Sequence, residues 1–259
     1  MTRAKSVRFD RLIEIEWLDA VAAEVAAGND SPTIRTRLSD LLEGHVAGGR
    51  KRGSSCHKTV GILCGVWLDV SPDMRGLRDR ALSILPSLST SERRALHWSL
   101  LVGGFPFFAE LVGNVGRLLE LQESLSMAQL TRRMRESWGD RSTMDKAAQR
   151  VMRSMVQWGF LVDEADKGVY ARGKGRVAVS GELAGLLLEG LLINEGKTIP
   201  VAQAATHPGL FPFTVSLNSH TLRHSSHFEV HRQGLDMDVV GLAEETEYDV
   251  RGNADHTEH

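Results

Sequence analysis

The chain has 259 residues, of which 42% are hydrophobic and 25% charged, with 31 lysines and arginines against 33 aspartates and glutamates. This length and composition indicate a globular protein with one large core or two to three smaller ones. Two cysteines exclude a disulfide framework, and no apolar run approaches the ~20 residues that a membrane-spanning helix needs. We therefore expect a cytoplasmic protein with no membrane partner; acidic residues near the N-terminus make a signal peptide unexpected.

Residues 1–122 are expected to form a helical domain. Amphipathic spacing of apolar residues predicts helices over residues 10–27, 33–46, 75–85, 91–101 and 107–122. The apolar residues of 57–68 fit either a helix or a strand. The glycine-rich loop 47–55 carries Arg50, Lys51 and Arg52, which are candidate phosphate contacts. The loop lacks the Lys-Ser/Thr pair of an ATP-binding loop, because Ser54-Ser55 stands there.

Residues 123–178 carry the local signals of a winged helix-turn-helix. Ser126 to Gln129 is a Ser-x-x-Gln capping box, and the helix it begins is ended by Gly139-Asp140-Arg141. Ser142 to Asp145 has the form of a second capping box and precedes a longer helix that ends at Gly159. The strand-like stretches 160–162 and 169–171 follow, joined by an acidic turn.

The second of these helices is predicted to have one apolar and one cationic stripe. The apolar residues recur at spacings of three and four, at Met144, Ala148, Val151, Met155 and Trp158. The opposite stripe contains no carboxylate and consists of Lys146, Gln149, Arg150, Arg153 and Gln157. The major groove of DNA admits one α-helix, whose Arg, Lys and Gln side chains reach base edges and phosphates. The pattern therefore predicts a DNA-recognition helix.

The distribution of charge agrees with a localised phosphate-binding face. Between Ser126 and Ala178 there are eleven lysines and arginines against six acidic residues, a balance of +5 in a chain whose total is −2, which leaves −7 for the rest. The predicted DNA contacts are Arg141, Ser142, Thr143, Lys146, Gln149, Arg150, Arg153, Lys167, Arg172 and Lys174, with Arg50, Lys51 and Arg52 as a second group. If about six phosphates are neutralised, the logarithm of affinity should fall with that of salt at a slope of about −5.

Residues 179–243 are expected to form a small α/β region and residues 244–259 a disordered tail. A helix is predicted over 181–193, strands over 211–215, 228–232 and 235–240, and a hairpin at Gln233-Gly234. Four histidines, at positions 220, 224, 227 and 231, would align on a helix, but the alternating pattern from Phe228 favours a strand. We expect no catalytic residue, no metal and no cofactor.

Three stretches carry a family resemblance. They are ALHWSLL at residues 95–101, FPFFAEL at 105–111, and the segment that begins with Arg141-Ser142-Thr143 and ends in Gln157-Trp158-Gly159-Phe160-Leu161. Together they resemble BrxA, the small DNA-binding component of BREX bacteriophage-defence systems. The resemblance implies two mainly helical parts, duplex DNA binding and action beside larger defence enzymes. The C-terminal β region and the N-terminal helix depart from that pattern.

The sequence thus predicts a mainly α protein, with a helical N-terminal domain, a winged helix-turn-helix and a small α/β region. Its expected function is non-enzymatic binding of double-stranded DNA with weak sequence preference, as an accessory component of a BREX-like system. Two alternatives remain open: a winged-helix scaffold that docks a larger defence enzyme, and a transcriptional regulator.

Overall fold

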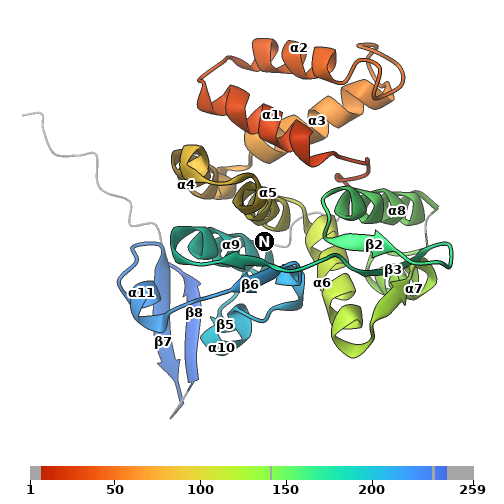
Figure 1. Ribbon diagram of the computed structural model, residues 1–259. Coiled ribbons are helices and arrows are strands. Elements are labelled where there is room, and N and C mark those ends of the chain that lie inside the picture. Colours follow the sequence, from red (N-terminus) through yellow and green to blue (C-terminus); the bar gives the residue numbers. More distant parts are fainter. Residues whose placement is uncertain (1–6, 141, 235–236, 244–259) are drawn as a thin grey trace, which may run out of the picture.

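The structure, a computed structural model, describes residues 7–140, 142–234 and 237–243. In this part the chain is mainly helical, with eleven α-helices and three small sheets (Figure 1). The mainly α class expected from the sequence is therefore confirmed. Arg141 and the expected tail 244–259 lie outside the described residues.

Three helices form a lobe at the top of Figure 1: α1 (Ile15–Ala26), α2 (Ser31–Leu41) and α3 (Ser55–Trp67). The carboxylate of Asp30 caps α2 by accepting a hydrogen bond from the amide of Thr33 at 2.9 Å. The helix predicted over 10–27 begins only at Ile15, because the backbone of the preceding residues bonds to another part of the chain. The ambiguous stretch 57–68 is helical.

The centre of the molecule contains α4 (Arg75–Ile84), α5 (Thr90–Gly104), α6 (Pro106–Leu121) and α9 (Gly181–Glu195), with short 3-10 turns at Pro72–Met74, Leu85–Ser87 and Pro208–Leu210. Ser89 and Glu92 form a capping box at the start of α5. No single helix of the described chain is long and apolar enough to cross a membrane. Helices α5 and α6 reach that length and composition only when taken together, and the chain bends by 115° between them.

Glycines let α5 and α9 approach closely. A Cβ atom added at Gly190 would lie 2.2 Å from the carbonyl oxygen of Ser99, and one at Gly103 would lie 3.2 Å from the Cα of Gly190. Both neighbours are backbone atoms, which cannot rotate away. The contact between the two helices therefore requires a residue without a side chain at position 190.

We expect Gly190→Ala to lower the free energy of unfolding by about 2 kcal/mol, because the overpacked backbone must shift. Denaturant titration measures the change. The matched control is Gly185→Ala on the same helix, where the added Cβ would lie 3.7 Å from the Phe228 ring, an ordinary contact. That control should be neutral or stabilising by up to about 1 kcal/mol. Equal effects of the two substitutions would contradict the close approach.

Residues 124–172 form a compact unit of two helices and a three-stranded sheet. Its elements are β1 (Ser124–Ser126), α7 (Met127–Trp138), α8 (Ser142–Gln157), β2 (Leu161–Asp163) and β3 (Val169–Arg172). The strand order is β1-β3-β2, and both pairs are antiparallel, with Ala171 opposite Ser124 on one side and Val162 on the other. The capping box at Ser126 and Gln129 is present.

The C-terminal region contains β4 (Val177–Val179), β5 (Ile199–Pro200), α10 (Val201–Ala204), β6 (Phe213–Val215), α11 (Ser219–Arg223), β7 (Phe228–Gln233) and β8 (Met237–Leu242). Strands β4 and β6 pair in parallel, and β5-β8-β7 form an antiparallel sheet. The predicted hairpin is β7–β8, in which Gln233 pairs with Met237.

One hydrophobic core joins the expected domains through Trp98 of α5. Its indole packs edge-on against the rings of Phe108, Trp158, Phe160, Phe211 and Phe213, with centroids 5.0 to 6.3 Å away. These rings come from all three expected domains, and the core is continuous from Phe9 to Val240. The domain boundaries stay a prediction, but the segments share their interior.

A second buried contact holds the upper lobe on α5. The ring of His97, 0% exposed, accepts a hydrogen bond at Nδ1 from the indole of Trp67 at 3.1 Å. Its Nε2 lies 3.0 Å from a carboxylate oxygen of Asp19. His97 thus links α1 and α3 to α5 as a neutral ring that accepts on one side and donates on the other.

Candidate nucleic-acid interface

The apolar stripe predicted for α8 is confirmed. Met144, Ala148, Val151 and Met155 are at most 1% exposed, and Trp158, just after the helix, is 2% exposed. These side chains fix α8 against the core and turn its other side outward. The predicted cationic stripe on that other side divides into two halves with different environments.

The outer side of the N-terminal half of α8 is open to solvent. Ser142, Thr143, Lys146 and Gln149 are all exposed. None of the four has an ion pair or side-chain hydrogen bond to another part of the described chain. The first amides of a helix have no partner within it and carry partial positive charge, so this end favours an anion.

Arg135 of α7 pairs with two acidic residues beside this helix start and offsets one of their two negative charges. Its guanidinium bonds to Asp145 at 2.6 Å and pairs with Asp140 at 3.2 Å. The hydrogen bond from Arg135 to Asp145, with the charges of both carboxylates, raises the pKa of Arg135. The second capping box predicted from the sequence is absent: α8 already begins at Ser142, and Asp145 accepts from Arg135 instead.

The C-terminal half of α8 is covered by the residues that precede α1. Arg150 donates to the carbonyl oxygen of Asp10 at 2.8 Å, and Ser154 accepts from the amide of Ile13 at 2.8 Å. Gln157 accepts from the amide of Ile15 at 3.0 Å, and Trp158 donates to the carbonyl of Ile13 at 2.9 Å. The non-helical backbone before α1 needs such partners, and α8 supplies them. Arg150 is therefore bonded within the chain and not free on the outer side, and the DNA contact expected of it stays a prediction.

Arg153 pairs with Asp163 of β2 at 2.5 Å. This hydrogen bond raises the pKa of Arg153. The two side chains are 42% and 51% exposed, and exposed pairs of this kind contribute about 0–1 kcal/mol. Arg153 consequently offsets one acidic charge of the hairpin. Breaking this ion pair costs little free energy, so Arg153 can exchange Asp163 for a phosphate.

The hairpin between β2 and β3 presents Lys167 at its tip, where the side chain is exposed and Gly168 makes the turn with φ +78°. Arg172 at the end of β3 is turned inward. It donates to the carbonyl of Phe211 at 3.2 Å and lies over that ring at 5.8 Å, and burial lowers its pKa. Arg172 is therefore engaged with Phe211, and the DNA contact expected of it stays a prediction. Lys174 is exposed.

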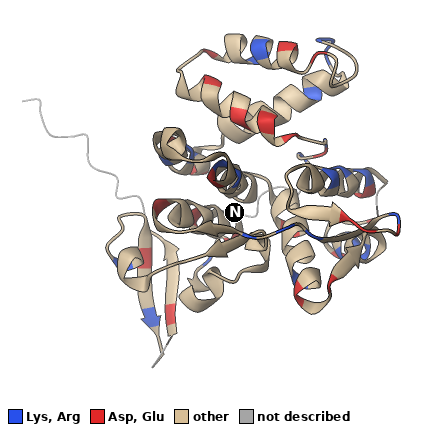
Figure 2. Cartoon of the chain, in the orientation of Figure 1, with Lys and Arg blue, Asp and Glu red and all other residues tan. Residues whose placement is uncertain are grey.

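The second predicted group lies on the upper lobe, in the connection between α2 and α3 at the top of Figure 2. Arg50 is in an ion pair with Asp40, while Lys51 and Arg52 are exposed. The structure therefore does not place this loop beside the start of α8. It remains a separate basic loop.

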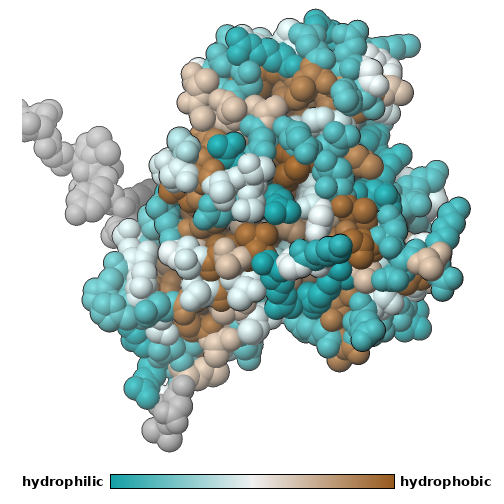
Figure 3. Space-filling view, in the orientation of Figure 1, coloured by the Kyte–Doolittle hydropathy of each residue, from teal (hydrophilic) through white to brown (hydrophobic). Residues whose placement is uncertain are grey.

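Two arginines of α7 were missed by the sequence prediction. Arg132 is exposed and Arg133 half-buried, and neither forms an ion pair with another residue that the structure describes. The buried stripe Leu130, Met134 and Trp138 leaves positions 132 and 133 off the apolar side. The spacing of these three apolar residues can be read from the sequence and would have placed both arginines on the outer side of α7. The edge formed by α8 and the hairpin, at the right of Figure 1, is mostly hydrophilic (Figure 3).

Comparison with known proteins adds no relative, since no protein family, curated protein or solved structure matches the chain.

Proposed function

We propose that the chain binds double-stranded DNA through a winged helix-turn-helix. The order of its elements from α6 through β1, α7 and α8 to the β2–β3 hairpin supports this assignment, as does the strand order β1-β3-β2. In this reading α8 is the recognition helix and the hairpin is the wing.

The observation that carries the proposal is the exposed, unpaired start of α8. Lys146 and Gln149 lie one turn apart on its outer side, where a lysine reaches phosphate or guanine and a glutamine reaches adenine. Ser142 and Thr143, with the free helix amides, would hold a backbone phosphate. Lys167 at the wing, Arg132 and Arg133 on α7, and Arg153 after exchange of Asp163 would contact flanking phosphates.

Few side chains in this set read bases, so the proposed sequence preference is weak. With no catalytic residues assigned, we propose an accessory role beside larger enzymes, as in a BREX-like defence system. The scaffold and regulator alternatives predict different results: a scaffold needs no DNA affinity, and a regulator requires one tight consensus in a competitive footprint.

The test is the affinity for a 20-base-pair duplex of the double variant Lys146→Glu, Gln149→Ala, measured by fluorescence anisotropy at low salt. We expect the Kd to rise about 10-fold or more, because one phosphate contact is lost and a like charge replaces it. The control is Lys197→Glu, the same charge change at a side chain 69% exposed near the end of α9. Unchanged Kd in the double variant, with an unchanged melting temperature, would overturn the proposal.

A further inference from the structure

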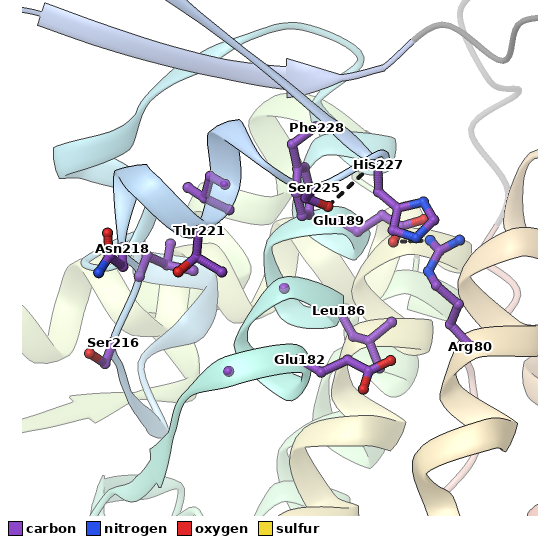
Figure 4. A pocket seen from close by; sticks show the side chains of 14 residues that line it. Arg80, Glu182, Leu186, Glu189, Ser216, Asn218, Thr221, Ser225, His227 and Phe228 are labelled. Atoms are coloured by element: carbon purple, nitrogen blue, oxygen red, sulfur yellow. Dashed lines mark hydrogen bonds and ion pairs between the residues drawn. The ribbon is translucent and has the colours of Figure 1, made fainter.

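A cavity of about 310 Å³ lies between α9, α11 and the start of β7, with Arg80 of α4 at one end (Figure 4). Its apolar lining consists of Leu186, Leu217, Leu222 and Phe228, and uncharged polar residues also line it, at Ser216, Asn218, Thr221 and Ser225. Gly181 and Gly185 of α9 line it without side chains, so bare helix backbone forms part of its surface. Such a surface lets a flat group approach closely. The volume is at the small end of the range for ligand pockets, about 300–1,000 Å³.

The charges at the cavity do not balance. Its ionisable lining residues are Arg80, Glu182, Glu189 and His227. The side chain of Glu189 is 10% exposed, and one of its oxygens accepts from Arg80. Its other oxygen has no hydrogen bond to any residue in the described ranges. Glu182 is exposed at the rim. Besides His227, the lining thus carries two carboxylates and one guanidinium, and Glu189, the more buried carboxylate, keeps spare acceptor capacity.

We propose that this cavity binds a small amine with a flat apolar body. The body packs between the glycine surface of α9 and the leucine and phenylalanine walls, and the ammonium group donates a hydrogen bond to the free oxygen of Glu189. The excess negative charge of Glu182 and Glu189 over Arg80 favours a cation over an anion. The site is separate from the proposed DNA interface, because no residue of α7, α8 or the β2–β3 hairpin lines the cavity, and α11 lies at the left of Figure 1 with α8 at the right.

The test uses the full chain and matched pairs of probes: tryptamine against indole-3-acetate, and phenethylamine against phenylacetate, titrated by calorimetry. Each pair shares a ring and differs in the charge of its head group. We expect the amines to bind at least about 10-fold more tightly than the acids. Equal binding within both pairs, or no binding of either amine, would overturn the proposal.

Two variants locate the binding. Gly185→Leu places a side chain in the cavity and should abolish binding of the amines. The matched control Gly61→Leu, at an exposed position of α3 outside the cavity where an added Cβ meets nothing within 4 Å, should retain it. Melting temperatures confirm that both variants fold. If Gly185→Leu is folded and binds tryptamine as the wild type does, the cavity is not the site. Lys146→Glu, which tests the DNA proposal, should leave amine binding unchanged.

Discussion

Replacing Trp98 with alanine is expected to lower the free energy of unfolding by about 4 kcal/mol, at the upper part of the range for aromatic-to-alanine changes. The indole is 0% exposed, contacts five aromatic rings and donates from Nε1 to the carbonyl of Gly209 at 2.9 Å. Alanine leaves a cavity at the point where three segments of the chain meet. It also leaves the buried carbonyl of Gly209 without its hydrogen-bond donor. Denaturant titration followed by circular dichroism measures the loss.

Trp98→Phe separates the two causes. Phenylalanine keeps a ring for the edge-on contacts and removes the donor to Gly209, so a loss of about 1–2 kcal/mol is expected. A loss below about 1 kcal/mol for Trp98→Ala would show that the ring is not the centre of the core.

Acid is expected to destabilise the protein through His97. Burial lowers the pKa of His97 from its ordinary value of 6.5, against the opposing effect of Asp19, and Arg93 lowers it further. The unfolded chain therefore binds a proton near pH 6.5 while the folded chain does not. The contribution of the neutral His97 to the free energy of unfolding is fully present above pH 6.5 and is lost progressively as the pH falls below that value. His207, whose pKa burial also lowers, adds a separate contribution of the same sign.

Two substitutions isolate this histidine. His97→Ala should cost about 3 kcal/mol at pH 7.5, because it opens a cavity and leaves the Trp67 indole N–H unsatisfied. In His97→Gln the amide oxygen can accept from Trp67 and the amide nitrogen can donate to Asp19 without titrating. Unfolding free energies at pH 7.5 and 5.5 should therefore differ less in His97→Gln than in the wild type. An equal difference would contradict the assignment.

Local patterns were sufficient to predict most of the helices and the surface of α8 that packs inward. The spacing of Met144, Ala148 and Val151, and the Ser126–Gln129 capping box, depend only on neighbours within one or two turns. The β7–β8 hairpin followed from alternation around Gln233-Gly234. Strands β1, β4 and β5 were missed because each has only two or three residues and pairs with a strand more than 30 positions away, so neither a period nor a local hairpin marks it.

The contacts of the outer side of α8 and of Arg172 at the end of β3 were harder to predict because the partners are distant in sequence. Asp10, which accepts from Arg150, is 140 positions away, and Phe211, which accepts from Arg172, is 39 positions away. No local pattern indicates such contacts. The same distance explains the late start of α1: the segment before Ile15 bonds to α8 instead of continuing the helix. The remaining contacts at the start of α8 stay a prediction.

The most direct test of the central claim is the salt dependence of duplex DNA affinity for the wild type and Lys146→Glu. We expect the logarithm of affinity to fall with that of salt at a slope of about −3 to −4 for the wild type, which corresponds to about four neutralised phosphates. Lys146→Glu should weaken binding and bring the slope about one unit closer to zero. No measurable affinity at low salt, or identical slopes for the two proteins, would contradict recognition of DNA by α8.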